Sequence, residues 1–414
     1  MSAHLPGNQP AQLPEAQISP LDLKPFEGGG RAMLLAAVLG GLGLALTAAG
    51  FFTAPRETLY AYLIAFAYWL GISLGGLALL MANHAARARW IVVVRRLTES
   101  LFAPLPLFAL LFLPILFGAR SLFVWIDPPA SLGKEALALI AHKRPYLNLG
   151  FFTARAALYF AVWLILGLTL RRWSRRQDAQ GGAALTRSTR RLSTGGLPFL
   201  AFTLTFAAFD WIMSLSPTWF STMFGLYYFA GSFVAAIAML CLASAIAHES
   251  GAGFGKLISP SHFHNLGKLL LAFVAFWAYI GFSQYMLIWV ANLPEEIPWV
   301  RLRDPGPFRA VGVFLILFHF LVPFFALLSR DLKRRPRALA VAAVWVLFVH
   351  YVDLYWIIMP TSHPQGLGLH WTQLTSFIGI GGSSVAWAIW RLRGGYAVPV
   401  GDPYLEESLR FVQP

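Results

Sequence analysis

The chain has 414 residues, of which 57% are hydrophobic and only 12% are charged, and its mean hydropathy is +0.62. Soluble domains carry roughly 25% charged residues, so this composition excludes an ordinary soluble protein. The net charge of +14 does not indicate a nucleic-acid partner, because the basic residues gather in short clusters between apolar stretches.

Stretches of about 20 apolar residues, long enough to cross a bilayer as helices, follow one another along the chain. They cover residues 31–53, 57–83, 97–118, 149–170, 196–215, 221–247, 265–291, 308–329, 337–360 and 369–392. The sequence therefore predicts an all-α polytopic membrane protein with about ten transmembrane helices.

The basic residues are distributed unevenly between the predicted loops. The termini and the loops after the second, fourth, sixth and eighth helices hold about 22 of them, and the opposite loops hold about 8. Because cytoplasmic loops carry the excess of Lys and Arg, both termini are predicted to be cytoplasmic. Residues 1–30 are polar and lack a short apolar segment with a cleavage site, which indicates a cytoplasmic tail and not a signal peptide.

Two predicted helices end in similar basic strings, RRWSRR at 171–176 and LLSRDLKRR at 327–335. The similarity indicates a repeat of four helices. We therefore predict two four-helix bundles, at 57–217 and 218–362. Helix one (31–56) flanks them on one side, and helix ten with a cytoplasmic tail (363–414) on the other.

Ionisable residues inside the apolar stretches are the main functional candidates. Asp210 lies in a long apolar, aromatic-rich run, where an ionised carboxylate costs roughly 2.5–3.5 kcal/mol. His350 and Asp353 are three residues apart and so share one face of their helix, which suits proton relay. His319 precedes Pro323 by four residues, and the proline should kink the helix and leave the His319 carbonyl without its helical donor. The alternative is that each group only bonds a neighbouring helix.

Helix seven adds two further polar groups, Tyr285 in its outer half and Lys268 near its cytoplasmic end, where a lysine can also simply extend its ammonium to the membrane surface. The complete set of proton-path candidates is Asp210, Lys268, Tyr285, His319, His350 and Asp353.

No phosphate-binding loop, nucleophile elbow or metal-spaced His/Cys cluster is recognisable, so no catalytic residue and no metal site are predicted. Cys241 is the only cysteine, which excludes an intrachain disulfide and a thiolate-ligated iron–sulfur cluster. His319 and His350 should lie at similar depths on adjacent helices, as ligands of a b-type haem would, but Asp353 beside His350 favours protons over haem iron.

Two long strings, FDWIMSLSPTWFSTMFGLYYFAG at 209–231 and FSQYMLIWVANLPEE at 282–296, closely resemble one membrane-protein family. Three shorter strings add to the resemblance: NHAARARWIVVVRR at 83–96, KRPYLNLGFFTARA at 143–156 and FHNLGKLLLAFVAFW at 263–277. The family is the second large membrane subunit of alternative complex III, a bacterial quinol:cytochrome c (or high-potential carrier) oxidoreductase. That subunit, also called quinone-binding subunit 2 or ActF, is of the polysulfide-reductase/NrfD-like type.

The resemblance implies two four-helix bundles with two extra helices, in the bacterial cytoplasmic (inner) membrane. It implies that this chain holds no cofactor itself, and that quinone or menaquinone, haem c and iron–sulfur clusters belong to the whole complex. The implied partners are a homologous NrfD-like membrane subunit, an iron–sulfur subunit, multihaem and monohaem c-type cytochromes and lipid, with a terminal oxidase as a further candidate. No nucleic acid is expected.

Residues and resemblance together lead us to expect a subunit of a quinol oxidoreductase complex that contributes scaffold and a proton-conducting path. The alternative is a quinone pocket in this chain, with Arg155, Tyr285 and His319 as donors and with Trp211 and Trp219 as aromatic walls. A secondary transporter is disfavoured, because prolines interrupt helix three but not helix seven, whereas transporter halves break at matching positions.

Overall fold

The computed structural model describes residues 25–251, 254, 257–304 and 306–413. These residues form an all-helical chain without a named strand, and one isolated bridge joins Pro25 to Tyr396. Most of the predicted N-terminal tail, residues 1–24, lies outside the described residues.

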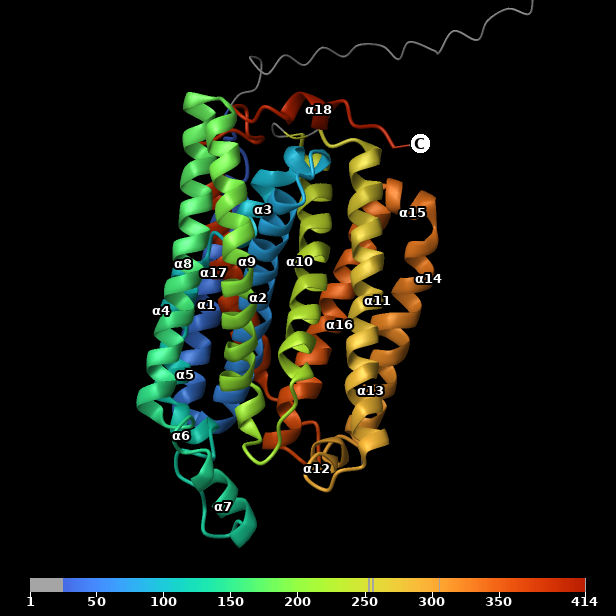
Figure 1. Cartoon of the computed structure of the whole chain (residues 1–414). Helices are drawn as coiled ribbons and strands as arrows, with labels where there is room; N and C mark the ends of the chain where they lie inside the picture. The colour runs from blue at the N-terminus through green and yellow to red at the C-terminus, as the bar shows by residue number, and fades with distance from the viewer. Residues whose placement is uncertain (1–24, 252–253, 255–256, 305, 414) are drawn as a thin grey trace, which may run out of the picture.

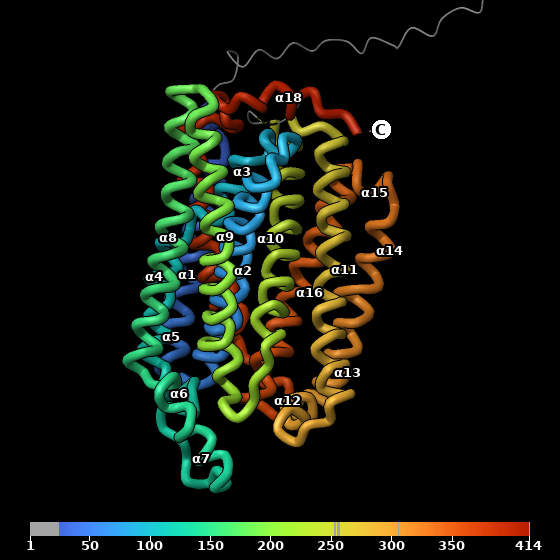
Figure 2. Tube along the Cα trace, in the orientation of Figure 1, coloured from blue at the N-terminus to red at the C-terminus, as the bar shows by residue number. Residues whose placement is uncertain are grey.

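The helices run nearly parallel to one another along the long axis of the molecule (Figures 1 and 2). The long ones are α1 (Gly30–Thr53), α2 (Pro55–Ala85), α8 (Leu149–Gln180), α9 (Ala183–Trp211), α10 (Met223–Ser250), α11 (Pro260–Ala291), α16 (Pro336–Ser362) and α17 (Trp371–Leu392). The short ones are α3 (Arg95–Leu101), α4 (Leu105–Leu111), α5 (Leu113–Phe117), α6 (Ala119–Leu122), α7 (Lys134–His142), α12 (Ile297–Arg301), α13 (Pro307–Leu315), α14 (Val322–Leu328), α15 (Arg330–Arg334) and α18 (Leu405–Leu409).

Within the described residues, 9 helical stretches are long and apolar enough to span a membrane, with 90–117 and 307–328 each counted as one. They coincide with the first nine predicted spans, so the prediction of an all-α polytopic membrane protein is confirmed. The predicted tenth span is helical as α17, but it is not among the nine. Its glycines, its serines and Gln373 make it less apolar than the others.

Helix α17 lies against α1 through small residues. A Cβ added at Gly43 would lie 2.5 Å from the backbone nitrogen of Gly379, and one at Gly379 would lie 2.7 Å from that of Leu44. Backbones that come this close need glycine, which is how membrane helices pack without bulky side chains. Thr47 on α1 adds a hydroxyl contact to Ser376 at 3.3 Å. This packing explains how a helix as polar as α17 is held in the assembly.

Helix α2 lies at the centre of the molecule and packs on α9, α10, α16 and α17. Its apolar stretch is 94% buried, far more than that of α1, so it contacts protein on nearly every face. Two groups of helices surround it. The first group consists of the segment 90–117, α8 and α9, which contact α2 or each other. The second group consists of α10, α11, α14 and α16, which pack together. The boundaries of the two predicted bundles stay a prediction.

The first described residues and the C-terminal segment lie at the same end of the molecule, where Phe26 donates its N–H to the Gly395 carbonyl at 2.7 Å. Helices α15 and α18 are at this end, and α6, α7 and α12 are at the opposite end (Figure 1). Between Phe26 and the C-terminal segment, the chain therefore runs from one end of the molecule to the other an even number of times.

A topology experiment checks the predicted cytoplasmic location of both termini. Alkaline phosphatase folds only outside the cytoplasm, so we expect a fusion after Pro414 to be inactive and an insertion beside Gly306, near α12, to be active. Phosphatase activity in whole cells is the measurement. The reverse pattern would show that the orientation is wrong.

Candidate functional site

A cluster of buried polar side chains lies in the middle of α16. His350 and Asp353 are each 1% exposed, and the Nδ1 atom of His350 is 3.7 Å from the Oδ2 atom of Asp353. The i,i+3 spacing places both side chains on one helical face, as the sequence predicts.

Two neighbouring helices orient the carboxylate of Asp353. The hydroxyl of Tyr227, on α10, donates to Oδ1 at 2.5 Å, and the indole N–H of Trp277, on α11, donates to Oδ2 at 3.1 Å. These bonds offset part of the cost of removing a carboxylate from water. Neither donor is evident in the sequence, because each is an aromatic residue in an apolar helix, where packing is its ordinary role.

His319 faces the same cluster from the next helix. It lies in a π-helical segment, Ile316–Leu321, which separates α13 from α14 and precedes Pro323. The π-helical segment thus lies where the proline is expected to kink the helix, and such segments are frequent at functional sites. The ring centre of His319 is 3.9 Å from that of Trp277 and 6.0 Å from that of His350.

The two imidazoles share an unusual property. His319 and His350 are 0% and 1% exposed, and no ring nitrogen of either has a hydrogen-bond partner among the described residues. A buried polar atom without a partner costs about 1–3 kcal/mol, and such atoms are few in folded proteins. Four such atoms on two neighbouring rings, one of them beside the Asp353 carboxylate, make this the strongest candidate site among the described residues. Water molecules would satisfy these atoms.

Gly231, on α10, makes room for the His350 ring. A Cβ added there would lie 2.7 Å from Cε1 and 3.2 Å from Nδ1 of His350, closer than real Cβ atoms come to other side chains. A single sequence gives no sign of this role, because glycines occur throughout these helices.

Asp210 belongs to a different cluster. Arg155, on α8, donates from Nε to Oδ2 at 2.8 Å and from a terminal nitrogen to Oδ1 at 2.9 Å. The hydroxyl of Tyr159, one helical turn after Arg155, donates to Oδ2 at 2.7 Å. Asp210 and Asp353 have no partner in common, so these two proton-path candidates have separate surroundings. A carboxylate in a two-point bond with a guanidinium is suited to holding helices together.

Aromatic rings surround the guanidinium of Arg155. Its central carbon is 3.8 Å from the ring centre of Tyr146 and 4.3 Å from that of Phe151, and a terminal nitrogen donates to the Tyr146 carbonyl at 2.9 Å. Burial and the negative charge of Asp210 raise the pKa of Tyr146, which lies in the loop before α8, so its phenol is neutral at physiological pH. Arg155 thus has all its main contacts within the protein.

The five quinone-site candidates do not gather around one point. Arg155 binds Asp210, and His319 stacks on Trp277. Trp211 packs among aromatic rings, with its ring centre 4.7 Å from that of Phe112. Trp219 stacks on Trp299 at 4.6 Å, and Tyr285 is 54% exposed on the outer face of α11.

An apolar cavity of about 320 Å³ does lie beside part of this set. Its walls come from the loop before α8, the end of α9 and the segment after α9. They include Tyr146, Phe206, Phe209, Met213 and Trp219. Tyr146 therefore separates this cavity from Arg155.

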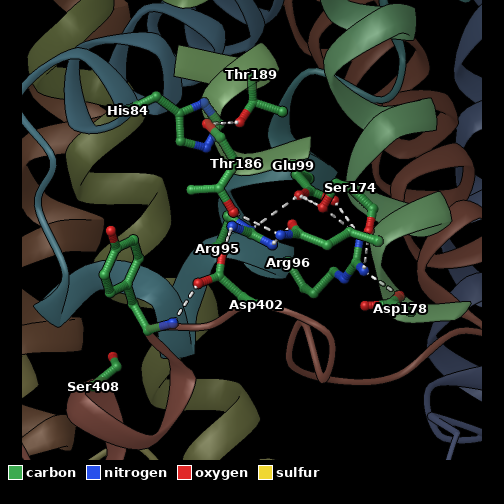
Figure 3. Close-up of polar contacts among 12 residues, drawn as sticks. His84, Arg95, Arg96, Glu99, Ser174, Asp178, Thr186, Thr189, Asp402 and Ser408 are labelled. Carbon is green, nitrogen blue, oxygen red and sulfur yellow. Dashed lines mark hydrogen bonds and ion pairs between the residues drawn. The ribbon is translucent and has the colours of Figure 1, made fainter. Parts of the chain in front are cut away.

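A third polar cluster lies at the end of the molecule that holds the termini (Figure 3). Arg96 bonds Glu99 at 2.7 Å and the Ser174 hydroxyl at 2.9 Å, and it also pairs with Asp178. Beside it, Arg95 pairs with Asp402 of the C-terminal segment. The sequence shows Arg95, Arg96 and Glu99, but not the partners that α8 and the C-terminal segment bring to them.

Lys268 contributes to none of these clusters, since it forms no hydrogen bond or ion pair within the described part of the chain. Of the six proton-path candidates, the structure thus brings together His319, His350 and Asp353, and it leaves Asp210, Lys268 and Tyr285 apart. No group of three or more His, Cys, Asp or Glu side chains that could hold a metal ion occurs in the described residues.

Comparison of the sequence with protein-family models and with curated proteins gave no match.

Proposed function

We propose that this membrane-embedded helical protein is a subunit of a quinol:electron-acceptor oxidoreductase of the alternative complex III type. In this proposal it holds no redox centre, serves as scaffold for a homologous membrane subunit, an iron–sulfur subunit and c-type cytochromes, and conducts protons. The string at 209–231 carries the family resemblance. It contains Asp210 of the cluster with Arg155, and also Tyr227 and Gly231, which contact the His350–Asp353 cluster.

The observation that carries the proton-conducting role is the cluster of His319, His350 and Asp353. An imidazole accepts a proton at one nitrogen and releases one from the other, and a nearby carboxylate stabilises the charged ring. Tyr227 and Trp277 hold the carboxylate in place, 3.7 Å from Nδ1 of His350, and in this proposal an intervening water carries the proton between the rings and Asp353. Intramembrane groups of this kind mark proton relays in pumps and transporters.

Asp353→Asn tests this role in the whole complex reconstituted into vesicles. The amide keeps the shape of the side chain and one acceptor oxygen but cannot take up a proton. We expect normal assembly and a severalfold fall in proton movement coupled to quinol oxidation, followed with a pH-sensitive dye inside the vesicles.

The matched control is Asp304→Asn, which removes an exposed carboxylate that pairs with Arg309 of α13. It should leave both proton movement and electron transfer unchanged. If Asp353→Asn also assembles and matches the wild type in both rates, the cluster is structural and the proton-conducting role is wrong.

A second candidate function, quinone binding, is favoured by the apolar cavity beside Tyr146. Its volume of about 320 Å³ is at the lower end of the range of small-molecule sites, and apolar walls suit an isoprenoid quinone. A photoreactive quinone analogue should then label Tyr146, Met213 or Trp219, as read by peptide mass spectrometry. Labelling that is confined to the sister subunit would exclude this candidate.

A further inference from the structure

A second cavity, of about 300 Å³, lies at the end of the molecule that holds α18. Its walls come from the end of α2, the start of α9, the segment that follows α2 and the C-terminal segment. Five arginines and one acid line it: Arg87, Arg89, Arg95, Arg187, Arg190 and Asp402. With His84 counted as neutral, the lining therefore carries a net charge of +4.

Three of these arginines lack a counter-charge. Arg89 pairs with Glu407 at 2.8 Å, and Arg95 pairs with Asp402. Arg87, Arg187 and Arg190 form no ion pair and no side-chain hydrogen bond with any described residue. Arg87 and Arg187 are exposed and Arg190 is half-buried, so these three arginines stand at the rim of the hollow, in contact with water. Their fields therefore add inside it.

The inner wall of the cavity offers further hydrogen-bonding groups. His84 lines it, with Nδ1 3.1 Å from the Ser193 hydroxyl and with a buried Nε2 that has no partner. Thr189, 6% exposed, and Arg95, also 6% exposed, form buried parts of the same wall (Figure 3). The cavity thus combines a buried polar wall with a rim of unpaired cations.

We propose that this cavity binds a phosphate group, supplied by the head group of an anionic phospholipid or by a soluble phosphate. Guanidinium groups donate two parallel hydrogen bonds to phosphate oxygens, and Arg is the preferred residue for such recognition. Basic pockets between the cytoplasmic ends of membrane helices are known to take acidic lipid head groups. The volume admits a head group and leaves acyl chains outside the cavity.

The test uses the full chain in a neutral detergent with three probes: dihexanoyl phosphatidylglycerol, dihexanoyl phosphatidylcholine and inorganic phosphate. Binding is measured by isothermal titration calorimetry on the wild type and on R87N/R187Q/R190Q. Arg87 has a left-handed backbone, φ 54°, which asparagine tolerates better than most residues, and glutamine suits the helix that holds Arg187 and Arg190. The triple variant therefore removes three cations with little cost to the fold.

The matched control is R330Q/R334Q/R335Q, which removes the same charge from the basic segment around α15, away from the cavity. Circular dichroism on heating verifies that both variants fold. Hydrogen bonds to charged groups are stronger than neutral ones, so the loss of the three arginines together should weaken binding about tenfold or more. We expect phosphatidylglycerol to bind the wild type and the control equally, to bind the triple variant at least tenfold more weakly, and phosphatidylcholine not to bind this site.

Competition separates the two sources of phosphate. If millimolar inorganic phosphate displaces phosphatidylglycerol, the phosphate group alone is recognised and a soluble ligand fits. If it does not, acyl chains contribute and the ligand is a lipid. The proposal is overturned if phosphatidylglycerol does not bind the wild type, if the triple variant binds it as tightly as the wild type, or if the control loses as much affinity as the triple variant.

Discussion

Arg155→Met is expected to lower the free energy of unfolding by about 3–5 kcal/mol, because it leaves the Asp210 carboxylate buried without its counter-charge. Asp210 is 1% exposed, and two of its three side-chain hydrogen bonds come from Arg155. Methionine keeps the apolar stem of the arginine side chain and removes the guanidinium, so the loss reports the guanidinium and its contacts. The measurement is the unfolding midpoint of the detergent-solubilised chain.

Two further variants separate the buried pair from surface charge. Arg309→Met breaks an exposed ion pair with Asp304 and should change stability by no more than about 1 kcal/mol. The double variant R155M/D210L removes both charges and should recover most of the loss, because no buried charge is left unpaired. Equal, small effects of Arg155→Met and Arg309→Met would show that water reaches Asp210.

This ion pair also shows what the sequence could and could not predict. Both residues are recognisable as candidates, Arg155 as a quinone donor and Asp210 as a proton carrier, because charges in apolar helices are conspicuous. Their pairing depends on how the antiparallel helices α8 and α9 lie side by side, across 55 residues of sequence. One sequence does not determine that register. The structure therefore changes the interpretation of both residues.

The His350–Asp353 pair illustrates the opposite case, because its geometry is local. Two residues three apart on a helix face the same way whatever the rest of the fold does. Their partners Tyr227 and Trp277 come from α10 and α11 and could not be identified, since nothing in an apolar helix distinguishes an aromatic residue that donates to an acid from one that only packs. The all-α membrane fold was predictable for a similar reason, because hydropathy acts over single helices.

Helix α17 marks the limit of the hydropathy argument. The helix was predicted at nearly its observed bounds, but it is held by backbone contact with α1 through Gly43 and Gly379 and not by its own apolarity. Such interfaces depend on the absence of side chains at matching heights on two helices far apart in sequence. A hydropathy pattern does not reveal which glycines meet.

Gly231→Ala is the second change with a large expected effect, because the new methyl group would lie 2.7 Å from Cε1 of His350. Both groups are on helices in the closely packed interior, so neither can move away without disturbing its neighbours. Overpacking of this kind costs about 1–3 kcal/mol, and we expect a loss of that size in the free energy of unfolding. Since the ring must also leave its present position beside Asp353, proton movement in the reconstituted complex should fall as well.

Gly195→Ala is the matched control, because Gly195 is a helical glycine on α9 with no atom within 4 Å of the added Cβ. Alanine suits a helix better than glycine by about 1 kcal/mol, so this variant should unfold at the same temperature as the wild type or at a higher one. In the double variant G231A/H350A the overpacking is relieved, because the smaller side chain at 350 leaves room for the methyl group. The double variant should therefore be at least about 1 kcal/mol more stable than the sum of the two single effects. Additive effects would show that Gly231 is not there to accommodate the ring of His350.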